Sequence, residues 1–538
     1  MPDPVLIIGA GPTGLTAALE LSRFGVPVRI VDKLAEPATT SRAIGVQART
    51  LELLDKRGLA DEMVRLGNPA SGGSIYGNGA RLFRLDFSGI ESRFPYILML
   101  SQAETERILT EAIARQGVTI ERGVELVALS EDVLSHDASP VKAVLRHADE
   151  RLELAAAPWL ISAEGAHSRV RTTLDLRFEG KTLPDDFALG DLHVAADLVP
   201  TDFHIFSSEH GFLGLFPLGG AQFRLIASHS SNEPNKDAPP SLEEQQAIYD
   251  HRSHIPARLS DLAWSSWFRI NSRMVTRLVA GRLLLGGDAA HIHSPAGAQG
   301  MNTGIQDMIN LGWKLAFVMQ GKAQPALLRT YKEDRIPVMR TVLTRTEGMT
   351  GIIGSENPVF RTLFNHLAPW IGGSGFVQEI ATARLSQIAL GYRTSSLSET
   401  YGHGELHAGD RLPEDTLARV GAGPEERPLF TVLDPSRFVL LAITVDGSVP
   451  EDLADAVRPW AGLVQAVGIA VPAEERARVR FESLFGKYGG VFVVRPDSYL
   501  GVVAGDHPAA AHLTAYFTKW LGPREQAHSH SEEHADAG

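Results

Sequence analysis

The segment VLIIGAGPTGLTAALELSRFGVPVRIVDK, residues 5–33, predicts a strand, a glycine-rich turn, a helix and a second strand. The apolar run Val5–Ile8 is typical of a strand buried in a parallel sheet. Apolar residues between Leu15 and Leu21 then repeat with helical spacing. A strand, helix and strand in this order predict the start of an α/β domain with a parallel sheet.

Three glycines stand at the junction of the predicted strand and helix. Gly9 allows a tight turn, Gly11 lets the backbone approach a pyrophosphate, and Gly14 allows the helix to pack close to the strand. The amino end of the helix offers free N–H groups and a positive dipole end to an anion. Asp32 ends the second strand, where a carboxylate can accept hydrogen bonds from an adenosine ribose. This pattern predicts a Rossmann-like dinucleotide site, and taken alone it fits NAD and FAD equally.

The composition of the chain is ordinary for a globular protein with several domains. Its 538 residues predict about three or four domains. Apolar residues make up 44% and charged residues 21% of the chain, close to the averages for such proteins. The net charge of −13, from 51 basic and 64 acidic residues, argues against nucleic acid or an anionic membrane as a partner. We therefore expect a small-molecule substrate.

The chain contains no cysteine, which excludes disulfides, thiol catalysis and zinc–thiolate sites. Its N-terminus lacks the basic region of a signal peptide, and no apolar run approaches the roughly 18 residues of a membrane span. We expect a cytoplasmic protein with no membrane partner, in which any redox chemistry depends on a bound cofactor.

A second motif lies in WLISAEGAHSRVR, residues 159–171, where an apolar strand precedes the pattern acid-Gly-x-x-Ser-x-Val-Arg. This pattern resembles the D-G-x-x-S-x-V-R element of the class A flavoprotein aromatic hydroxylases, the group of para-hydroxybenzoate hydroxylase, phenol hydroxylase and the polyketide hydroxylases. Here Glu164 stands where the family usually has aspartate. The longer acid keeps the charge but changes the reach of the carboxylate.

The segment LLLGGDAAHIHSPAGAQGMNTGIQDMINLGWKL, residues 283–315, permits two interpretations. Its acids and histidines, Asp288, His291, His293 and Asp307, suggest a metal site. The two histidines, however, are two residues apart, which is not the i, i+4 spacing of a paired zinc site, so we expect no metal. The segment instead resembles the family's G-D-A-A-H-x-x-x-P-x-x-G-x-G-x-N element.

That resemblance implies a flavin site. Asp288 would accept hydrogen bonds from the ribityl chain, and residues 297–302 would begin a helix whose amino end stabilises the reduced flavin ring. Ala298 replaces a glycine of many relatives and adds a methyl group close to the ring. Arg42 and Gln102 match family positions that contact the ribityl chain or the ring. The cofactor residues implied are Gly9, Gly11, Pro12, Thr13, Gly14, Asp32, Lys33, Arg42, Gln102, Glu164, Gly165, Gly287, Asp288, Pro295, Gly297, Gly300, Met301 and Asn302.

No second strand-G-x-G-x-x-G-helix unit occurs in the chain. The resemblance accounts for this absence, because the family carries FAD as its resident cofactor and binds NADPH or NADH only as a transient reductant. Its other partners are O2 and a small aromatic substrate. A homodimer, the commonest oligomer, is compatible with the sequence but not specified by it.

The fold that the resemblance implies is α/β in three parts. A Rossmann-like FAD-binding domain carries an inserted mixed β-sheet for the substrate, and a thioredoxin-like domain follows, whose characteristic element resembles VVRPDSYLG, residues 493–501. In the helices after the flavin motif, Lys332, Arg335 and Arg340 predict a solvent-exposed basic face. The expected boundaries are 1–180 and 276–390 for the two parts of the FAD-binding domain, 181–275 for the mixed sheet, 391–403 for a linker, 404–525 for the thioredoxin-like domain and 526–538 for a disordered tail.

The mixed sheet is expected to line the substrate cavity with one face. Its stretch is rich in strand formers, with Gly219 and Gly220 as a hairpin turn. The sequence does not identify a catalytic base: phenol hydroxylase has an aspartate where this chain has Ile44, and His210 and Tyr76 are only substitutes for it. The substrate-binding candidates are Phe216, Arg224, Trp267 and Arg269.

The function implied is an FAD-dependent, NAD(P)H-consuming monooxygenase that hydroxylates a phenolic or polyketide-type aromatic substrate through a flavin C4a-hydroperoxide. Epoxidation, Baeyer-Villiger-like insertion or dehydrogenation on the same fold stays open. A halogenase is not expected, because WSSWFRI lacks the W-x-W-x-I-P motif. A non-catalytic flavin-binding scaffold is a third alternative, which the intact flavin motifs disfavour.

Overall fold

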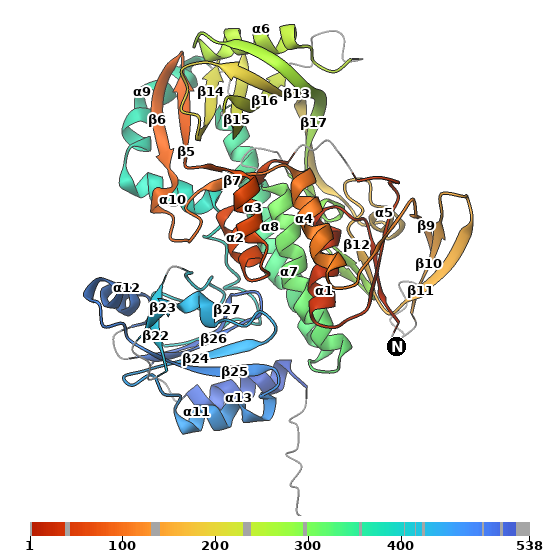
Figure 1. Cartoon of the computed structure of the whole chain (residues 1–538), viewed down its shortest axis with the longest axis vertical. Helices are drawn as coiled ribbons and strands as arrows, with labels where there is room; N and C mark the ends of the chain where they lie inside the picture. Colours follow the sequence, from red (N-terminus) through yellow and green to blue (C-terminus); the bar gives the residue numbers. More distant parts are fainter. Residues whose placement is uncertain are drawn as a thin grey trace, which may run out of the picture. The chain divides into compact units, whose positions relative to one another are not determined.

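The computed structural model describes residues 3–37, 43–130, 140–229, 238–293, 299–353, 358–402, 404–414, 416–421, 425–486, 489–505 and 509–522 (Figure 1). The chain forms two compact units, Met1–Ala316 with Tyr331–Gly391, and Phe317–Thr330 with Tyr392–Gly538. Four positions of the predicted flavin site, Arg42, Pro295, Gly297 and Ala298, lie outside the described residues, as does the predicted tail 526–538.

A six-stranded sheet lies at the centre of the first unit. Its strands, in spatial order, are β18 (Val279–Ala280), β19 (Leu283–Leu285), β12 (Leu160–Ser162), β1 (Val5–Ile8), β2 (Val28–Asp32) and β8 (Ile120–Arg122). All neighbours pair in parallel except β18 and β19. The side chains of β1 and β19 are buried, as expected for a parallel sheet covered on both faces. The predicted strand, turn, helix and strand over residues 5–33 are confirmed.

Helices surround this sheet, with α1 directly after β1 and α4 beside α1 (Figure 1). Short 3-10 turns are η1 (Phe87–Gly89) and η3 (Gly287–Ala289). The helices that begin in the first unit are α1 (Pro12–Arg23), α2 (Ala48–Asp55), α3 (Ala60–Leu66), α4 (Gln102–Ala114), α5 (Arg169–Thr173), α6 (Leu242–Ser253), α7 (Gly300–Met319), α9 (Pro358–Gly372) and α10 (Gly375–Leu385). Helix α8 (Arg329–Ile353) begins at the end of the segment 317–330, after the turn η4 (Pro325–Leu328), and returns the chain to the first unit.

A mixed eight-stranded sheet forms the second layer of the first unit. Its strands, in spatial order, are β20 (His291–Ile292), β17 (Arg258–Met274), β13 (Glu179–Ala195), β16 (Gln222–His229), β15 (Gly211–Gly219), β14 (Asp202–Ser208), β5 (Gly72–Gly77) and β6 (Ala80–Asp86). Gly219 and Gly220 both have positive φ in the turn between β15 and β16. Strands β5, β6 and β20 lie outside the range 181–275 expected for this sheet, because strands distant in sequence complete it.

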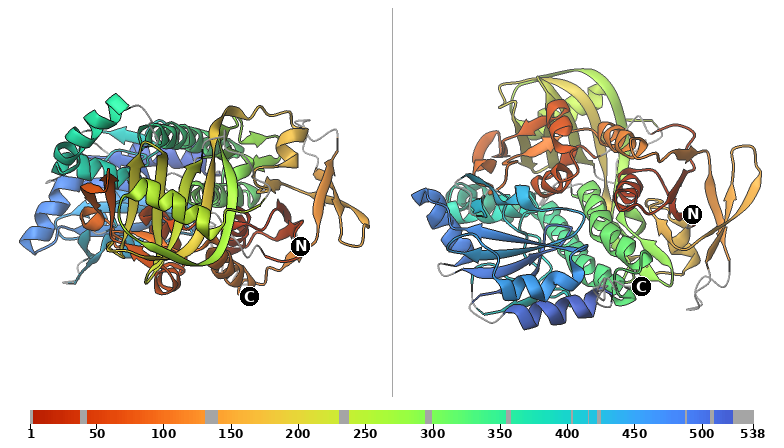
Figure 2. Two further views of the ribbon diagram at one scale, coloured as in Figure 1. Left: turned by 90° about the horizontal axis from the view of Figure 1, so that it is seen from above. Right: turned by 60° about the horizontal axis from the view of Figure 1, so that its bottom comes forward.

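Helix α6 covers one face of this sheet, as the view from above shows (Figure 2). Residues of α6 and of the central strands share one apolar cluster, which includes Phe206, Leu213 and Tyr249. A second cluster, which includes Phe187 and Phe268, lies on the opposite face. We call this opposite face the inner face, because it is the face turned away from α6.

Two three-stranded sheets complete the first unit. One has the order β3 (Gly45–Val46), β7 (Ile97–Met99), β4 (Asn68–Ala70), and the other has the order β11 (Leu152–Ala157), β10 (Val141–Arg146), β9 (Glu125–Leu129).

The second unit is built on a mixed seven-stranded sheet. Its strands, in spatial order, are β21 (Glu399–Tyr401), β27 (Leu500–Ala504), β26 (Gly490–Val494), β24 (Phe438–Thr444), β25 (Val464–Ala470), β22 (Leu417–Val420) and β23 (Glu426–Pro428). Its helical elements are η5 (Leu429–Val432), α11 (Glu451–Val457), η6 (Arg458–Trp460), α12 (Glu475–Phe485) and α13 (Ala509–Trp520). The arginine of the R-P-D motif, Arg495, is buried and forms a salt bridge with Asp497, with Nη2 2.6 Å from Oδ2.

This architecture confirms the expected fold class of a Rossmann-like domain, a mixed sheet and a thioredoxin-like C-terminal part. Among the described helices, none combines the length and the hydropathy of a membrane span.

Candidate functional site

The turn after β1 is shaped by close contacts that only glycine allows. Gly9 has a φ of +103°, and a Cβ built on it would lie 2.3 Å from the carbonyl oxygen of Ala163. A Cβ on Gly14 would lie 1.8 Å from the carbonyl oxygen of Gly9. A Cβ on Gly11, in contrast, would meet no atom of the described residues within 4 Å. Gly9 and Gly14 therefore serve the packing of the turn, whereas Gly11 faces open space.

That space is a cavity of about 590 Å³ at the carboxyl ends of β1 and β2. Its volume is within the range of small-molecule and cofactor sites. Helix α1 begins here at Pro12, and its N-cap residue, Gly11, has no side chain that could cap the N–H groups of the first turn. The predicted residues that line the cavity are Gly9, Gly11, Asp32, Lys33, Gln102, Glu164 and Gly165.

Asp32 holds the turn and still faces the cavity. Its Oδ2 accepts a hydrogen bond from the backbone N–H of Ala10 at 2.6 Å, and its Oδ1 accepts one from that of Leu34 at 2.8 Å. A carboxylate has about four acceptor positions, so two backbone donors leave room for a ribose hydroxyl.

Glu164 caps the short helix α5. Its carboxylate accepts hydrogen bonds from the hydroxyls of Ser162 and Ser168, at 2.8 and 2.7 Å, and from the backbone N–H groups of Arg169 and Val170, at 3.0 and 3.1 Å. The longer acid thus spans from the end of β12 to the first turn of α5. This contact fixes the position of the backbone at Gly165, beside the cavity.

Two further residues with structural roles near the flavin motifs were not predicted from the sequence, and one of them, Glu106, lines the cavity. Glu106 lies one helical turn after Gln102 and accepts a hydrogen bond from its Nε2 at 2.7 Å. Burial raises the pKa of Glu106. Arg171 donates to the carbonyl oxygens of Ala289 and Ala166, at 3.1 and 2.6 Å, and so joins the α5 turn to η3. The i, i+4 spacing of Gln102 and Glu106 on one helix was the available signal for the first.

In the flavin motif of residues 283–315, η3 lies next to α1. Gly287 has a φ of +57°, and a Cβ on it would lie 2.3 Å from the hydroxyl oxygen of Thr13. Asp288 is exposed. Asn302, in the first turn of α7, is buried; it donates to the carbonyl of Gly45 at 2.8 Å and accepts from the N–H of Gln47 at 2.9 Å. Gly300 and Met301 precede it at the start of α7.

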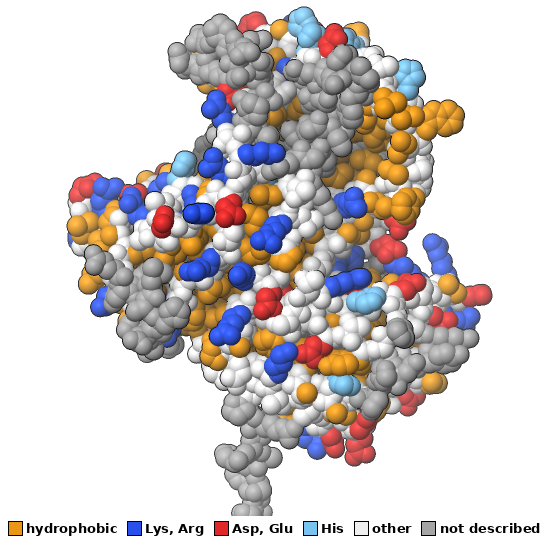
Figure 3. Space-filling model, turned by 180° about the vertical axis from the view of Figure 1, so that it is seen from behind, with side chains coloured by type: hydrophobic (Ala, Val, Ile, Leu, Met, Phe, Trp, Pro, Cys, Tyr) orange, Lys and Arg blue, Asp and Glu red, His pale blue; other side chains and the backbone are white. Residues whose placement is uncertain are grey.

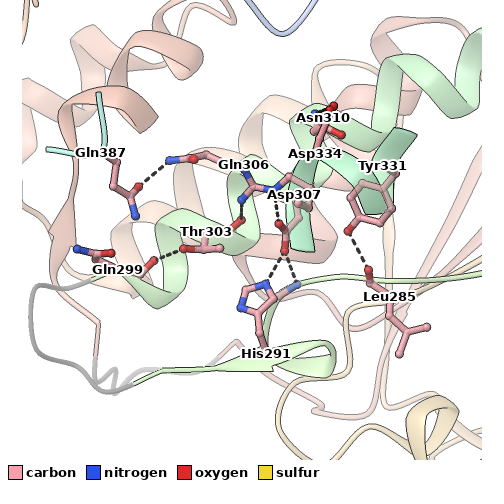
Figure 4. A network of polar contacts seen from close by, with 12 residues as sticks. Leu285, His291, Gln299, Thr303, Gln306, Asp307, Asn310, Tyr331, Asp334 and Gln387 are labelled. Atoms are coloured by element: carbon pink, nitrogen blue, oxygen red, sulfur yellow. Dashed lines mark hydrogen bonds and ion pairs between the residues drawn. The ribbon is translucent and has the colours of Figure 1, made fainter. Parts of the chain in front are cut away.

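The histidines and Asp307 of this motif form a buried network, of which Figure 4 shows His291 and Asp307. His291 Nε2 lies 2.6 Å from Asp307 Oδ2, and His291 Nδ1 lies 2.8 Å from His293 Nε2. Asp307 also accepts hydrogen bonds from the backbone N–H of Gly287, at 3.1 Å, and from Nε of Arg335, at 2.7 Å. Among the described residues there is no group of three or more side chains that could hold a metal ion.

The environment of Arg335 differs from the one predicted from the sequence. The side chain was expected on a solvent-exposed basic face, but it is fully buried against Asp307. Lys332 and Arg340 are exposed as expected. Burial raises the pKa of Asp307, but the Arg335 guanidinium and His291 together lower it below its usual value. Burial and the neighbouring His291 lower the pKa of His293 well below its ordinary value.

A second part of the network joins α7 to α8 and to residue 387 (Figure 4). Lys314 Nζ lies 2.7 Å from Asp334 Oδ2, and both side chains are fully buried. Gln306 Nε2 donates to Oε1 of Gln387 at 2.7 Å, and the Tyr331 hydroxyl donates to the carbonyl of Leu285 at 2.8 Å. These bonds fasten the helices to the strand that leads into η3.

The structure separates the four substrate-binding candidates into two pairs. Phe216 packs against the inner-face cluster, with its ring centroid 6.1 Å from that of Phe203. Arg224 lies on the same face, since it alternates along β16 with Phe223 and Leu225 of the cluster under α6. Its guanidinium forms a two-point salt bridge with Asp191, at 2.6 and 2.7 Å.

The other pair lies on the face covered by α6. Trp267 and Arg269 alternate along β17 with Phe268 of the inner face. Trp267 Nε1 donates to the carbonyl of Ala238 at 2.9 Å, and Arg269 forms an exposed salt bridge with Asp186 at 2.8 Å. The structure therefore does not bring this pair together with Phe216 and Arg224.

The two candidates for a catalytic base also lie away from the inner face. The Tyr76 hydroxyl is 3.3 Å from Nδ1 of His204, and the Tyr76 ring stacks on Phe206 within the cluster under α6. His210 lies exposed in the turn between β14 and β15, 3.6 Å from Glu209. Asp191 was not predicted as a site residue, although a single acid inside the apolar stretch FALGDLHV, residues 187–194, could have indicated it.

Comparisons with known proteins find similarity along both units. A family model described as an FAD binding domain matches residues 3–346, and one described as the C-terminal domain of aromatic-ring hydroxylases matches residues 406–523. The curated 6-methylpretetramide 4-monooxygenase of Streptomyces rimosus is 35% identical over 95% of this chain and 92% of its own. Pentachlorophenol 4-monooxygenase of Sphingobium chlorophenolicum is 31% identical over 93% and 94%. The solved structure of an anhydrotetracycline hydroxylase from Streptomyces rimosus has a TM-score of 0.77 at 29% identity and covers 98% of this chain and 100% of that one.

Proposed function

Because this chain belongs to the FAD-dependent aromatic-ring hydroxylases and is a flavoprotein monooxygenase, we propose that the cavity after β1 holds the adenosine and pyrophosphate of FAD and that NADPH or NADH reduces the flavin. The observation that supports the FAD placement most directly is Gly11: it is the glycine whose missing side chain leaves room for a ligand rather than for the protein. Bound FAD would supply electron transfer and oxygen activation.

The residues around the cavity have separate tasks in this proposal. The uncapped first turn of α1 receives the pyrophosphate, whose charge the N–H groups and the helix dipole stabilise. Asp32 accepts hydrogen bonds from the ribose hydroxyls. Gln102 and the exposed Asp288 bind the ribityl chain, and Asn302 holds the backbone of Gly45 and Gln47 in place.

The substrate is proposed to bind against the inner face. That face presents partly exposed aromatic rings, Phe212, Phe216 and Trp264, which suit a flat, multi-ring phenol. Two relatives are named for the compounds 6-methylpretetramide and anhydrotetracycline. Aromatic faces of this kind favour stacking and exclude water from the reacting ring.

Arg224 and Asp191 add a preference for the charge of the substrate. The Arg224 side chain is only 4% exposed and is neutralised by the two-point salt bridge to Asp191. Among the described residues, Nη1 of Arg224 is buried without a hydrogen-bond partner, so a substrate oxygen that reaches it would supply the missing acceptor. Because the pair carries no net charge, we expect a neutral carbonyl or hydroxyl oxygen there rather than a carboxylate.

The proposed function is tested on the purified, FAD-loaded protein. A panel of mono- and multi-ring phenols is scored for stimulated oxidation of NADPH and of NADH, and the products are analysed by mass spectrometry with labelled O2. We expect one labelled oxygen atom in a multi-ring phenol. A labelled epoxide or ester product, or oxidation of the substrate without label, would contradict hydroxylation; a failure to bind FAD would contradict the cofactor placement.

The charge preference is tested by Asp191→Asn. This change leaves Arg224 with an uncompensated positive charge, so the ratio of kcat/KM for 4-hydroxybenzoate over 4-hydroxyacetophenone should rise by about tenfold or more. Asp186→Asn is the matched control, because Asp186 pairs with Arg269 on the opposite face of the sheet. Equal ratios in the two variants would exclude Arg224 from the substrate site.

A further inference from the structure

Helix α9 has two apolar faces, of which one has no partner in the chain as described. One side packs on strand β6: a Cβ on Gly372 would lie 2.5 Å from the Phe83 ring, and Asn365 lies against Gly77. The other side exposes Leu363, Leu367, Trp370 and Ile371 at 57%, 45%, 84% and 53%, and α10 adds Phe376 at 73%. We call these five residues the α9 stripe.

The α9 stripe stands out from an ordinary surface because it lacks charge. From residue 362 to residue 378 the sequence contains no Asp, Glu, Lys or Arg. Seen from behind, hydrophobic side chains gather over the part of the molecule that α9 occupies (Figure 3). A contiguous apolar patch without interspersed charges is typical of a binding surface rather than of solvent-exposed protein.

We propose that the α9 stripe is the interface of a homodimer, in which α9 of one copy packs against α9 of a second copy across a twofold axis. A twofold contact places the same patch on both sides. An uncharged apolar stripe meets this condition without any rearrangement, because it presents no like charges to its own copy.

The area of the stripe agrees with this assignment. Aromatic side chains bury roughly 150–250 Å² each, so two largely exposed aromatic and three half-exposed aliphatic side chains amount to on the order of 600 Å² per copy. Two copies then bury on the order of 1,200 Å², the lower limit for a specific protein interface.

A membrane surface fits the stripe less well. Helices that lie in a membrane interface carry Lys and Arg on their polar face. On the side of α9 opposite the stripe, Asn365 lies against Gly77 of β5, Gly372 lies against Phe83 of β6, and Ala368 is buried. The whole chain has a net charge of −13. Anionic lipid would be repelled rather than attracted.

Sedimentation velocity of the FAD-loaded, full-length protein tests the proposal. We expect the wild type to be a dimer at micromolar concentration, and Leu367→Glu and Trp370→Glu each to weaken the dimer by about 30-fold or more, the effect of a central interface residue. Val445→Glu is the matched control, because Val445 is a 95% exposed aliphatic residue of the second unit; it should remain a dimer. A monomeric wild type, or dimeric Glu variants with unchanged association, would overturn the proposal.

The absence of cysteine allows a second test that does not depend on the Glu variants. Leu367→Cys places a single thiol in the stripe of each chain, and Val445→Cys places one far from it in sequence. A short bis-maleimide should link two Leu367→Cys chains and not two Val445→Cys chains. Equal linkage of both would overturn the proposal. So would binding of the monomeric wild type to phosphatidylcholine–phosphatidylserine vesicles that Trp370→Glu abolishes, which would assign the stripe to a membrane.

Discussion

Gly11 and Gly14 stand in the same turn, but the space around them differs, and this difference predicts different mutants. A Cβ on Gly11 would meet no atom within 4 Å in the described part of the chain, whereas one on Gly14 would lie 1.8 Å from the carbonyl oxygen of Gly9. Gly11→Ala should therefore leave the Tm of the apoprotein unchanged and weaken FAD binding by about tenfold or more, equivalent to about 1.4 kcal/mol.

Gly14→Ala, in contrast to Gly11→Ala, should lower the Tm of the apoprotein. Because its methyl group collides with backbone, the apoprotein itself should be destabilised before any cofactor is added. Thermal unfolding of both apoproteins and fluorescence titration with FAD measure the two quantities separately. Equal losses of Tm in the two variants would show that Gly11 also serves packing, and that the cavity does not receive the pyrophosphate.

At this scale the sequence predicts residues whose role is local. Gly9, Gly14 and Asp32 follow from the geometry of one turn and one strand end, within 24 residues of each other. The burial of Arg335 does not, because its partner Asp307 lies on a different helix and the two meet only when α7 and α8 pack. A charged side chain on a helix is exposed by default unless such a partner is known.

His293, which directly follows β20, predicts an effect of pH on the stability of the protein. His293 is buried beside His291, and its pKa is lowered well below the ordinary value of 6.5. In the unfolded chain this histidine takes up a proton below about pH 6.5, whereas in the folded protein it stays neutral. Acidification below pH 6.5 therefore favours unfolding, with a slope of up to about 1.4 kcal/mol per pH unit.

His293→Gln removes this proton uptake. The variant should lose less stability than the wild type between pH 6.5 and pH 5, measured as the change in Tm or in the urea midpoint. His210→Gln is the control for the loss of a histidine side chain that is exposed rather than buried. If the His293 variant ran parallel to the wild type, the histidine would be protonated in the folded protein.

Strand β17 shows why the substrate face could not be predicted element by element. Trp267 and Arg269 were reasonable candidates in a strand-rich stretch, but they alternate with Trp264 and Phe268, which belong to the inner-face cluster. Both faces of β17 carry large side chains, and α6 covers one of them, so sequence alternation alone does not reveal which set faces inward.

At the scale of the whole molecule, the second unit contains a segment from the middle of the chain. Ala323 forms an antiparallel β-bridge with Leu521, and the N–H of Gln324 donates to the carbonyl of Trp520 at 2.9 Å. The ring centroids of Phe317 and Phe438 are 6.4 Å apart. A fragment of residues 392–522 should therefore be less stable than the same unit in the full chain. A synthetic peptide of residues 317–330 should bind to it and raise its Tm.

The measurement is thermal unfolding of the fragment with the peptide and with a scrambled peptide of the same composition. An identical Tm with both peptides would mean that the segment 317–330 contributes nothing to this unit. The outcome also decides where the unit begins, since the sequence placed its start at a linker over 391–403, and no composition change marks residues 317–330.

The architecture itself was predictable because each motif stands in a fixed structural context. The residues 5–33 specify a strand, turn and helix by spacing, and the flavin motifs at 159–171 and 283–315 each contain a short apolar strand at their start, β12 and β19. The origin of the outer strands of the eight-stranded sheet was not predictable. Strands β5 and β6 come from residues 72–86, and they join the sheet through β14, which follows them by more than a hundred residues.

The order of the six-stranded sheet, β18-β19-β12-β1-β2-β8, has a consequence for the synthesis of the protein. Strand β1 is made first, but β19, two places away in the sheet, ends only at Leu285. At about 5–20 residues per second, the ribosome needs on the order of tens of seconds to deliver the missing strands. Parallel sheets with distant strands also fold slowly once complete. From the completion of β12 at Ser162 until β19 is made, the nascent chain therefore exposes an unpaired edge of β12, and we expect its yield in a cell to depend on chaperones that bind unfinished sheets.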